Sequence, residues 1–152
     1  MSKVLRPSDR AAVVATIDPD VLTATTHDSD WVDMSKFERI MAIPMLGTFG
    51  EGAEFDAKLQ QATDSSGTDA KDITGKAITQ WSEDVSPVSE DKQAVINCRA
   101  DELDVTNGFT HARLRITVAA ASCDGGAVVL GFDPRQGPAS DNDLASVAEI
   151  VA

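Results

Sequence analysis

Few residues of this 152-residue chain have side chains suited to catalysis, and none falls in a known catalytic spacing. The only histidines are His27, which opens a polar run, and His111, which lies where polar and apolar residues alternate. Each is most simply a surface residue. The sequence has no Gly-X-Ser-X-Gly nucleophile elbow, and its glycine-rich run at 47–52 lacks the lysine of a phosphate-binding loop. We therefore expect no catalytic residue, no cofactor-binding residue and no enzymatic activity.

Two acidic segments offer oxygen atoms that calcium could use, Asp18-Pro-Asp and Asp64-Ser-Ser-Gly-Thr-Asp. Neither matches the EF-hand loop, which needs alternating ligands and a final glutamate twelve positions along. The two cysteines, Cys98 and Cys123, lack the close spacing of a zinc site. We therefore expect no metal site.

The cysteines themselves have different surroundings. Cys98 alternates with Ala94, Ile96 and Ala100, which predicts a reduced residue in the core, whereas Cys123 lies in a predicted turn. A disulfide between them is disfavoured in a reducing compartment.

The segment at 109–118 has the clearest structural pattern. Its apolar residues fall on one side of a period of two, and its polar residues fall on the other. The apolar set is Ala112, Leu114, Ile116 and Val118, and the polar set is His111, Arg113, Arg115 and Thr117. This alternation predicts a strand with Leu114 in a core and Arg113 in water. Residues 54–61 repeat the pattern, which is typical of antiparallel sheets.

Further strands are predicted at 21–26, 71–80 with a bulge near Gly75, 92–100 and 127–132. Residues 11–17 could be a strand or a turn of helix, and 27–33, 47–52, 85–91, 106–108 and 122–126 are predicted loops or turns. The strand at 37–46 is apolar on both sides from Ile40 onward, so we expect it to be central or covered on both faces. Pro44 instead indicates an edge position or a bulge.

These segments predict an all-β fold, an antiparallel β-sandwich or jelly-roll-like domain of seven to eight strands. Its apolar fraction of 42% is enough for one core. We expect an extended N-terminal arm at 1–20, the sandwich at 21–138 and a short C-terminal tail at 139–152. The tail has apolar residues at helical spacing and could be a short amphipathic helix or an extended arm.

The net charge and the hydropathy argue against two classes of partner, nucleic acids and membranes. The net charge of −12 argues against nucleic acid, which needs a concentrated basic face. Residues 1–10 contain no apolar signal core, and no run has the length of a membrane span, so we expect cytoplasmic synthesis and no membrane partner.

The N-terminal arm differs from the rest of the chain. Its first ten residues carry a net charge of +2, which leaves −14 on the remainder. Pro7 and Pro19 favour an extended arm, which loses less entropy when it docks. The candidate partner-binding residues combine positive charge with apolar contacts, and they are Lys3, Val4, Leu5, Arg6, Arg10, Val13 and Val14.

Three stretches carry a resemblance to known proteins. They are Phe37-Glu-Arg-Ile-Met-Ala-Ile-Pro-Met-Leu-Gly, Phe55-Asp-Ala-Lys-Leu-Gln-Gln-Ala-Thr-Asp-Ser-Ser-Gly-Thr, and Ala112-Arg-Leu-Arg-Ile-Thr-Val followed by Ala127-Val-Val-Leu-Gly-Phe-Asp-Pro-Arg. Over about residues 37–138 the chain resembles small virion structural proteins of tailed phages, encoded beside the major capsid gene. The resemblance implies a β-sandwich of the capsid decoration, or cement, type and supplies no catalytic residue.

The expected function is therefore a capsid decoration protein, made in the host cytoplasm and placed on the exterior of a phage head. Its partners would be the major capsid protein and further copies of itself, with a homotrimer favoured. Another virion component, such as a head–tail protein, a tail protein or a head-fibre base, is the alternative. A carbohydrate-binding module or small hydrolase is disfavoured, because two tryptophans, five phenylalanines and no tyrosine leave few rings to stack on a sugar.

Overall fold

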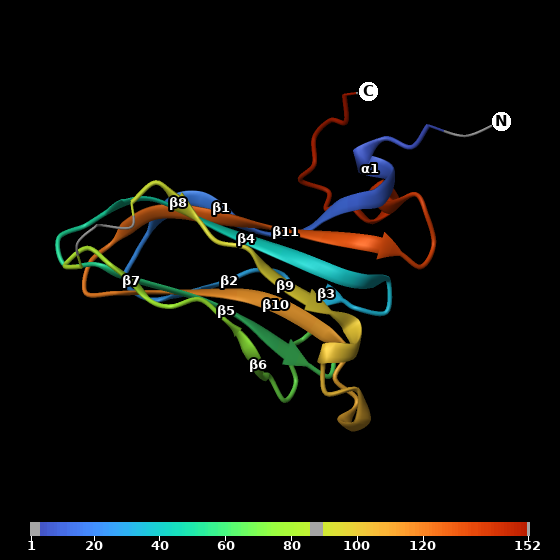
Figure 1. Cartoon of the computed structure of the whole chain (residues 1–152), viewed down its shortest axis with the longest axis horizontal. Coiled ribbons are helices and arrows are strands. Elements are labelled where there is room, and N and C mark those ends of the chain that lie inside the picture. The colour runs from blue at the N-terminus through green and yellow to red at the C-terminus, as the bar shows by residue number, and fades with distance from the viewer. Residues whose placement is uncertain (1–3, 86–89, 152) are drawn as a thin grey trace.

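The chain folds into a β-sandwich, shown in Figure 1 by a computed structural model that describes residues 4–85 and 90–151. Three short helical turns and one four-residue helix accompany the strands. In chain order the elements are α1 (Pro7–Arg10), β1 (Ala11–Leu22), β2 (Thr26–Asp28), β3 (Val32–Asp33), β4 (Phe37–Phe49), β5 (Glu54–Ala62), β6 (Lys71–Ala77), β7 (Trp81–Ser82), β8 (Lys92–Gln93), β9 (Ile96–Arg99), η1 (Ala100–Glu102), η2 (Val105–Asn107), β10 (His111–Ala119), β11 (Cys123–Pro134) and η3 (Ala139–Asn142). None of the described helices is long and apolar enough to cross a bilayer.

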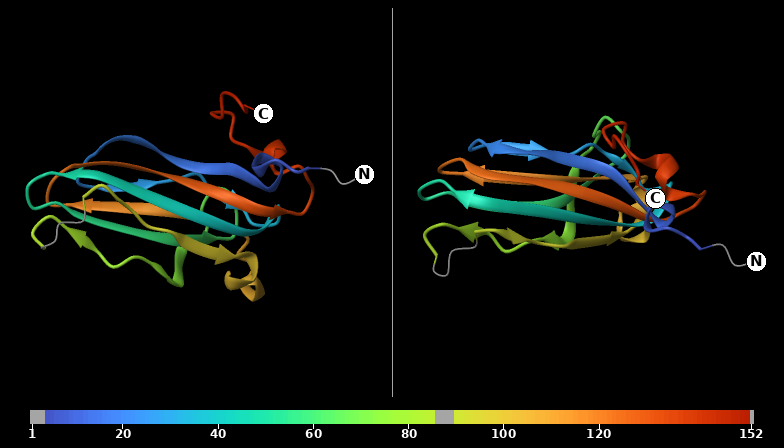
Figure 2. Two further views of the ribbon diagram at one scale, coloured as in Figure 1. Left: turned by 45° about the horizontal axis from the view of Figure 1, so that its top comes forward. Right: turned by 90° about the horizontal axis from the view of Figure 1, so that it is seen from above.

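The strands form two antiparallel sheets that lie face to face (Figure 2). Sheet A has the order β1-β11-β4-β8, and β9 continues β8 along the same edge of β4. Sheet B has the order β2-β10-β5-β6, with β3 beside β10 and β7 beside β5. If β2/β3, β6/β7 and β8/β9 count as interrupted single strands, the orders become 1-8-3-6 and 2-7-4-5. This is the eight-stranded jelly roll, which confirms the predicted fold class.

The core fills the space between the sheets. On β10, Ala112, Leu114 and Ile116 are completely buried, and Leu114 lies opposite the equally buried Leu59 of β5. The faces predicted from the alternation at 109–118 and 54–61 are therefore correct. Cys98 is also buried, as its spacing predicted.

Residues 11–20 depart from the expected N-terminal arm. They belong to β1, which pairs with β11 along the edge of sheet A, so the arm prediction is wrong for this part of the chain. Between Val13 and Ala15 the register shifts by one residue, which places Val14 in a β-bulge. The bulge interrupts the period of two, and this is why periodicity alone could not distinguish a strand from a helix here.

The C-terminal segment covers part of the free edge of β1. The Val13 N–H donates to Asp143 Oδ1 at 2.7 Å, and the Leu144 N–H donates to the Val13 carbonyl at 2.9 Å. Only the η3 turn is helical in the described part of this tail, so the helix considered for 140–152 does not form. The Leu144 N–H and the Asp143 carboxylate are instead bound to β1, which protects an edge strand.

Two predicted loops also contain strands. Residues 26–28 and 32–33 pair with β10, and between them the buried Ser29 exchanges hydrogen bonds with the backbone of Leu114. Cys123, expected in a turn, is the buried first residue of β11.

Strand β4 is central, as its two apolar sides predicted, with β11 on one edge and β8 and β9 on the other. Pro44 lies in its interior. The Pro44 carbonyl accepts from the Ala94 N–H at 3.1 Å, so its nitrogen faces the gap between β8 and β9. Proline has no backbone N–H to donate. The hydrogen bond that is missing for this reason therefore lies where the neighbouring strand is interrupted, and the sheet loses little.

Candidate interaction surface

Local contacts occupy both histidines and Asp64, which are among the groups that could serve a metal or a reaction. His27 Nε2 lies 2.9 Å from the Thr23 carbonyl, and His111 Nδ1 lies 2.8 Å from Thr110 Oγ1. Asp64 accepts hydrogen bonds from the Ser66 and Thr68 N–H groups and from Thr68 Oγ1, and these bonds hold the pKa of its carboxyl below the usual value. Within residues 4–85 and 90–151, no cluster of three or more His, Cys, Asp or Glu side chains could hold a metal.

The outer face of sheet B is polar and internally paired. Asp28 accepts from Arg115 Nε at 2.6 Å and Nη2 at 2.8 Å, and Arg113 Nη1 lies 3.1 Å from the same carboxylate. The hydrogen bond from Arg115 is the main cause of the lowered pKa of Asp28. Lys58 Nζ similarly lies 2.8 Å from Asp72 Oδ2. This network satisfies the charges of the face without a partner molecule.

Arg113 is less exposed than the alternation predicted. Its side chain is only 16% exposed, and the guanidinium lies 4.5 Å from the centre of the Trp31 ring. Arg113 Nε and Nη2 also donate to Gln60 Oε1 at 3.1 and 3.0 Å. The residue is on the outer face as expected, but its neighbours cover it.

The outer face of sheet A is apolar over its middle. We call this surface the apolar face, and its members are half-buried or exposed side chains that project away from the core. They are Val13 of β1, Met41, Ile43 and Met45 of β4, and Val128, Leu130 and Phe132 of β11. The register sets them in rows, because Leu130 lies opposite both Val13 and Met41, and Val128 lies opposite Ile43.

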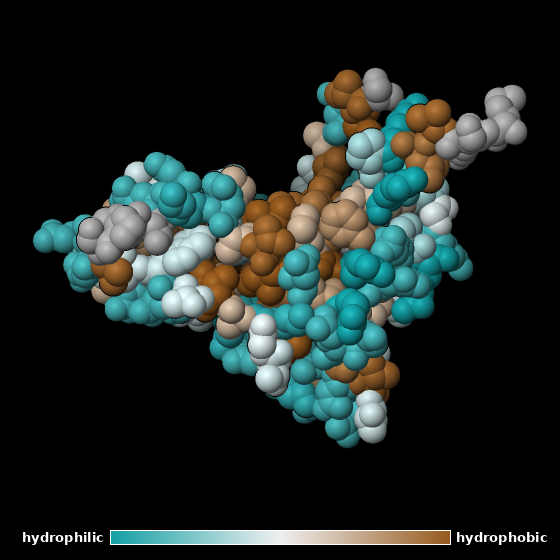
Figure 3. Space-filling model, viewed as in Figure 1, coloured by the Kyte–Doolittle hydropathy of each residue, from teal (hydrophilic) through white to brown (hydrophobic). Residues whose placement is uncertain are grey.

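Figure 3 shows apolar surface gathered in the middle of the molecule, where β4, β9 and β11 lie in Figure 1. Val95, between β8 and β9, adds to this surface and is 56% exposed. A contiguous apolar area of this kind is uncommon on a soluble monomer and marks an interaction site. The two outer faces therefore differ in chemistry, since that of sheet B carries paired charges and that of sheet A is apolar over its middle.

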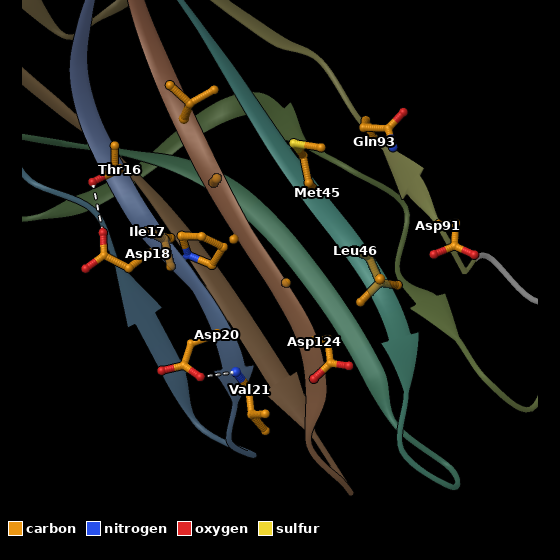
Figure 4. A pocket seen from close by; sticks show the side chains of 16 residues that line it. Thr16, Ile17, Asp18, Asp20, Val21, Met45, Leu46, Asp91, Gln93 and Asp124 are labelled. Carbon is orange, nitrogen blue, oxygen red and sulfur yellow. Dashed lines mark hydrogen bonds between the residues drawn. The ribbon is translucent and has the colours of Figure 1, made fainter. Parts of the chain in front are cut away.

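One end of sheet A is hollowed into an open groove of about 830 Å³, which we call the acidic groove. It follows β11 between β1 and β4, as Figure 4 shows. Apolar groups and glycines form its floor, namely Ile17, Pro19, Met45, Gly125, Gly126, Ala127 and Val128. Four carboxylates stand along it, those of Asp18, Asp20, Asp91 and Asp124.

Gly126 lets β1 pack closely against β11 beside the groove. A Cβ on Gly126 would lie 2.8 Å from Pro19 Cα and 2.9 Å from the Ile17 carbonyl oxygen. Such contacts are too short for any side chain, so the close passage of β1 over β11 requires glycine there.

The seven N-terminal residues expected to bind a partner do not form one surface. Val4 is 89% exposed, Leu5 is 43% exposed, and Arg6 and Arg10 are exposed at the two ends of α1. Lys3 lies outside the described residues. Val13 instead belongs to the apolar face.

Val14 cannot serve as a docking residue in this fold, because it is only 8% exposed within the β1 bulge.

The apolar face was missed as a site by sequence reasoning. Its signal was present in the two segments that are apolar on both sides, 40–46 and 127–132, since strands of that composition are normally covered on both faces.

The two cysteines are unpaired and buried. Burial raises the pKa of Cys98 and of Cys123 to about 11, so both thiols stay protonated at neutral pH. Protonated buried thiols are poor nucleophiles.

Comparison with known proteins finds no matching family model and no matching curated protein. Several solved structures match at low identity. A chain in the structure of infectious bursal disease virus Gt strain is 15% identical, with a TM-score of 0.45, and the match covers 92% of this chain and 38% of that one. A chain of the cowpea mosaic virus empty virus-like particle is 11% identical, with a TM-score of 0.45, and coverages of 90% and 87%.

A chain from Bacillus endospore appendages, described as a family of disulfide-linked pili, is 12% identical with a TM-score of 0.34, and the match covers 87% of this chain and 98% of that one. This protein thus spans well under half of the length of the infectious bursal disease virus chain that it matches.

Proposed function

We propose that this protein is a structural component of a tailed-phage particle, with no enzymatic activity, that attaches to the outside of the head through its apolar face. The observation that carries the proposal is the difference between the two outer faces. Sheet B presents charges that pair with one another, whereas sheet A presents Met41, Ile43 and Leu130 as partly exposed apolar side chains. The choice of a phage particle as the assembly rests on the resemblance of residues 37–138 to virion structural proteins of tailed phages.

The physical basis is burial of apolar area. Each Å² of apolar surface removed from water contributes about 25 cal/mol, so full burial of an exposed Leu or Ile side chain is worth roughly 1.5–3 kcal/mol. The side chains of the apolar face are already partly buried, so each contributes only a part of this value; together they supply the central contact of a protein interface, which is normally apolar with a polar rim. The major capsid protein is the proposed partner for the members of this face that lie outside the acidic groove, which are Val13, Met41, Ile43, Leu130 and Phe132.

Contacts that are individually weak are sufficient to hold a protein on a phage head when each copy makes several of them. Once one copy binds, contacts between neighbouring copies become intramolecular in effect, and their contributions multiply the apparent affinity. We propose that the protein acts as a homo-oligomer, with a trimer at local threefold positions as the favoured form. The net charge of −12 suits a solvent-facing location rather than contact with packaged nucleic acid.

The decisive experiment measures binding to heads prepared from phage that lack this gene. Ile43→Asp and Leu130→Asp place a charge in the centre of the apolar face, and Thr117→Asp makes the same kind of change on the outer face of sheet B. We expect each apolar-face variant to reduce co-sedimentation with heads at least tenfold, while Thr117→Asp binds like the unmodified protein. Melting curves of all variants verify that each is folded.

Immunogold labelling of complete particles locates the protein. Label over the head surface is the expected result. Label confined to the tail or to the head–tail junction would replace the decoration role with that of another virion component. Equal binding of heads by all three variants would refute attachment through the apolar face.

A further inference from the structure

The acidic groove carries charge that the rest of the molecule does not neutralise. Its four carboxylates form no ion pair with the described residues, whereas Asp28, Asp72, Asp104 and Asp133 do. Among the described residues, Asp124 accepts from Thr48 Oγ1 at 2.8 Å, Asp20 from the Val21 N–H at 2.7 Å and Asp18 from Thr16 Oγ1 at 3.5 Å, and none of these donors is charged. No lysine or arginine lines the groove. Negative charges around an apolar hollow attract a cationic, partly apolar ligand.

One segment of this chain has that composition. In residues 4–10, Val4 and Leu5 are exposed, and the side chains of Arg6 and Arg10 form no ion pair with any part of the chain that the structure describes. Lys3 precedes them in the sequence. An apolar pair flanked by cations complements an apolar floor flanked by carboxylates.

A copy cannot place this segment in its own groove. Helix α1 packs against η3 at the end of the sandwich opposite the groove, where Figure 1 also shows the N-terminus. Pro19 lies nine residue steps along the chain from Arg10, with eight residues of β1 between them, which corresponds to about 30 Å of extended strand. Six residues span about 20 Å at most when fully extended, which is less than this distance.

We infer that the acidic groove binds the N-terminal segment of a second copy of this chain. Val4 and Leu5 of the incoming segment contact the floor at Pro19, Met45 and Val128. Arg6 and Arg10 face the carboxylates of Asp18, Asp20 and Asp124. The contact is head-to-tail, so repetition around a closed ring gives every copy one filled groove. The inference concerns contacts between copies of this chain, and it does not depend on whether these copies attach to a phage head.

Charge reversal tests the inference on the full-length protein by sedimentation velocity over a range of concentrations. The arm variant carries Arg6→Glu and Arg10→Glu, and the groove variant carries Asp20→Lys and Asp124→Lys. We expect each to weaken self-association at least tenfold, about 1.4 kcal/mol. A chain with all four changes should regain association, because the charges are again complementary. Asp30→Lys, on an exposed residue of the polar linker between β2 and β3, is the control and should leave association unchanged.

A labelled peptide of residues 1–10 provides a second measurement that needs no oligomer. We expect it to bind the arm variant, whose grooves are empty, and to bind at least tenfold more weakly when Asp20→Lys and Asp124→Lys are added. Failure of the four-change chain to associate, or peptide binding that ignores the groove changes, would overturn the inference. Association that survives both charge reversals would also overturn it.

If the groove variant loses binding to phage heads while its self-association is intact, the occupant is the capsid protein and not a second copy. That outcome would leave the proposed function standing and reject this inference.

Discussion

Replacing Leu114 by alanine tests whether the core of this sandwich is correctly described. Leu114 is completely buried in the middle of β10 and lies opposite Leu59, which is also completely buried. Its backbone is held by Ser29 on one side, and these hydrogen bonds survive the substitution. Leu-to-Ala changes at such sites cost about 2–5 kcal/mol, because the lost burial is compounded by the cavity left behind.

We expect a loss near the middle of that range, about 3–4 kcal/mol. Leu114 is completely buried, so the side chains around it can relax only partly into the cavity that the substitution leaves. For a domain of this size each kcal/mol lowers the melting temperature by about 2–4 °C, so Leu114→Ala should melt about 6–16 °C lower. A loss of this size is a large share of a typical total stability of about 5–15 kcal/mol.

Urea unfolding followed by the fluorescence of Trp31 and Trp81 measures the free energy of unfolding directly. Thr117→Ala is the matched control, because Thr117 is on the same strand but on the outer face, where changes typically cost about 0.5 kcal/mol. Similar losses for the two variants would show that the faces of β10 have been assigned the wrong way round. An unchanged slope with urea would confirm that both variants unfold from the same compact state.

Two further predictions concern titratable groups. The pKa of Asp28 is lowered in the fold, chiefly by the hydrogen bond from Arg115, so its contribution is complete above the unfolded value near 3.8 and is lost as pH falls through the lower folded value. Asp28→Asn should therefore cost about 1 kcal/mol at pH 7, measured by urea unfolding, and the variant should lose less stability than the unmodified protein below about pH 4. Because burial raises the pKa of Cys98 and Cys123 to about 11, a thiol-specific reagent at pH 8 should label neither cysteine in the folded protein and both in urea; rapid labelling of the folded chain would contradict their burial.

The sequence by itself determined the class of fold and the orientation of its clearest strands. A period of two is a local property of extended backbone, so the alternation at 109–118 and 54–61 identified which side chains face the core without knowledge of their partners. The same reasoning placed Cys98 inside. It also showed that 40–46 and 127–132 are apolar on both sides, and these two segments were the sequence signal of the apolar face.

The tertiary structure alone decided which segments become neighbours. Val13 meets Asp143 across 130 positions of sequence, and Arg115 meets Asp28 across 87. No local pattern encodes such pairs, because they depend on the order in which distant strands join a sheet. The bulge at Val14 hid β1 for the same reason, since only its pairing with β11 shows that the irregular segment is a strand.

The candidate sites were also settled by packing. A segment that is apolar on both sides predicts two covered faces, but only the arrangement of the two sheets shows that the core covers one face of β4 and β11 and leaves the other open. The acidic groove likewise exists because β1, β11 and the residue before β8 bring four carboxylates, distant in the sequence, to one hollow. Electrostatic and apolar complementarity are properties of surfaces, and surfaces are made by residues that are distant in the chain.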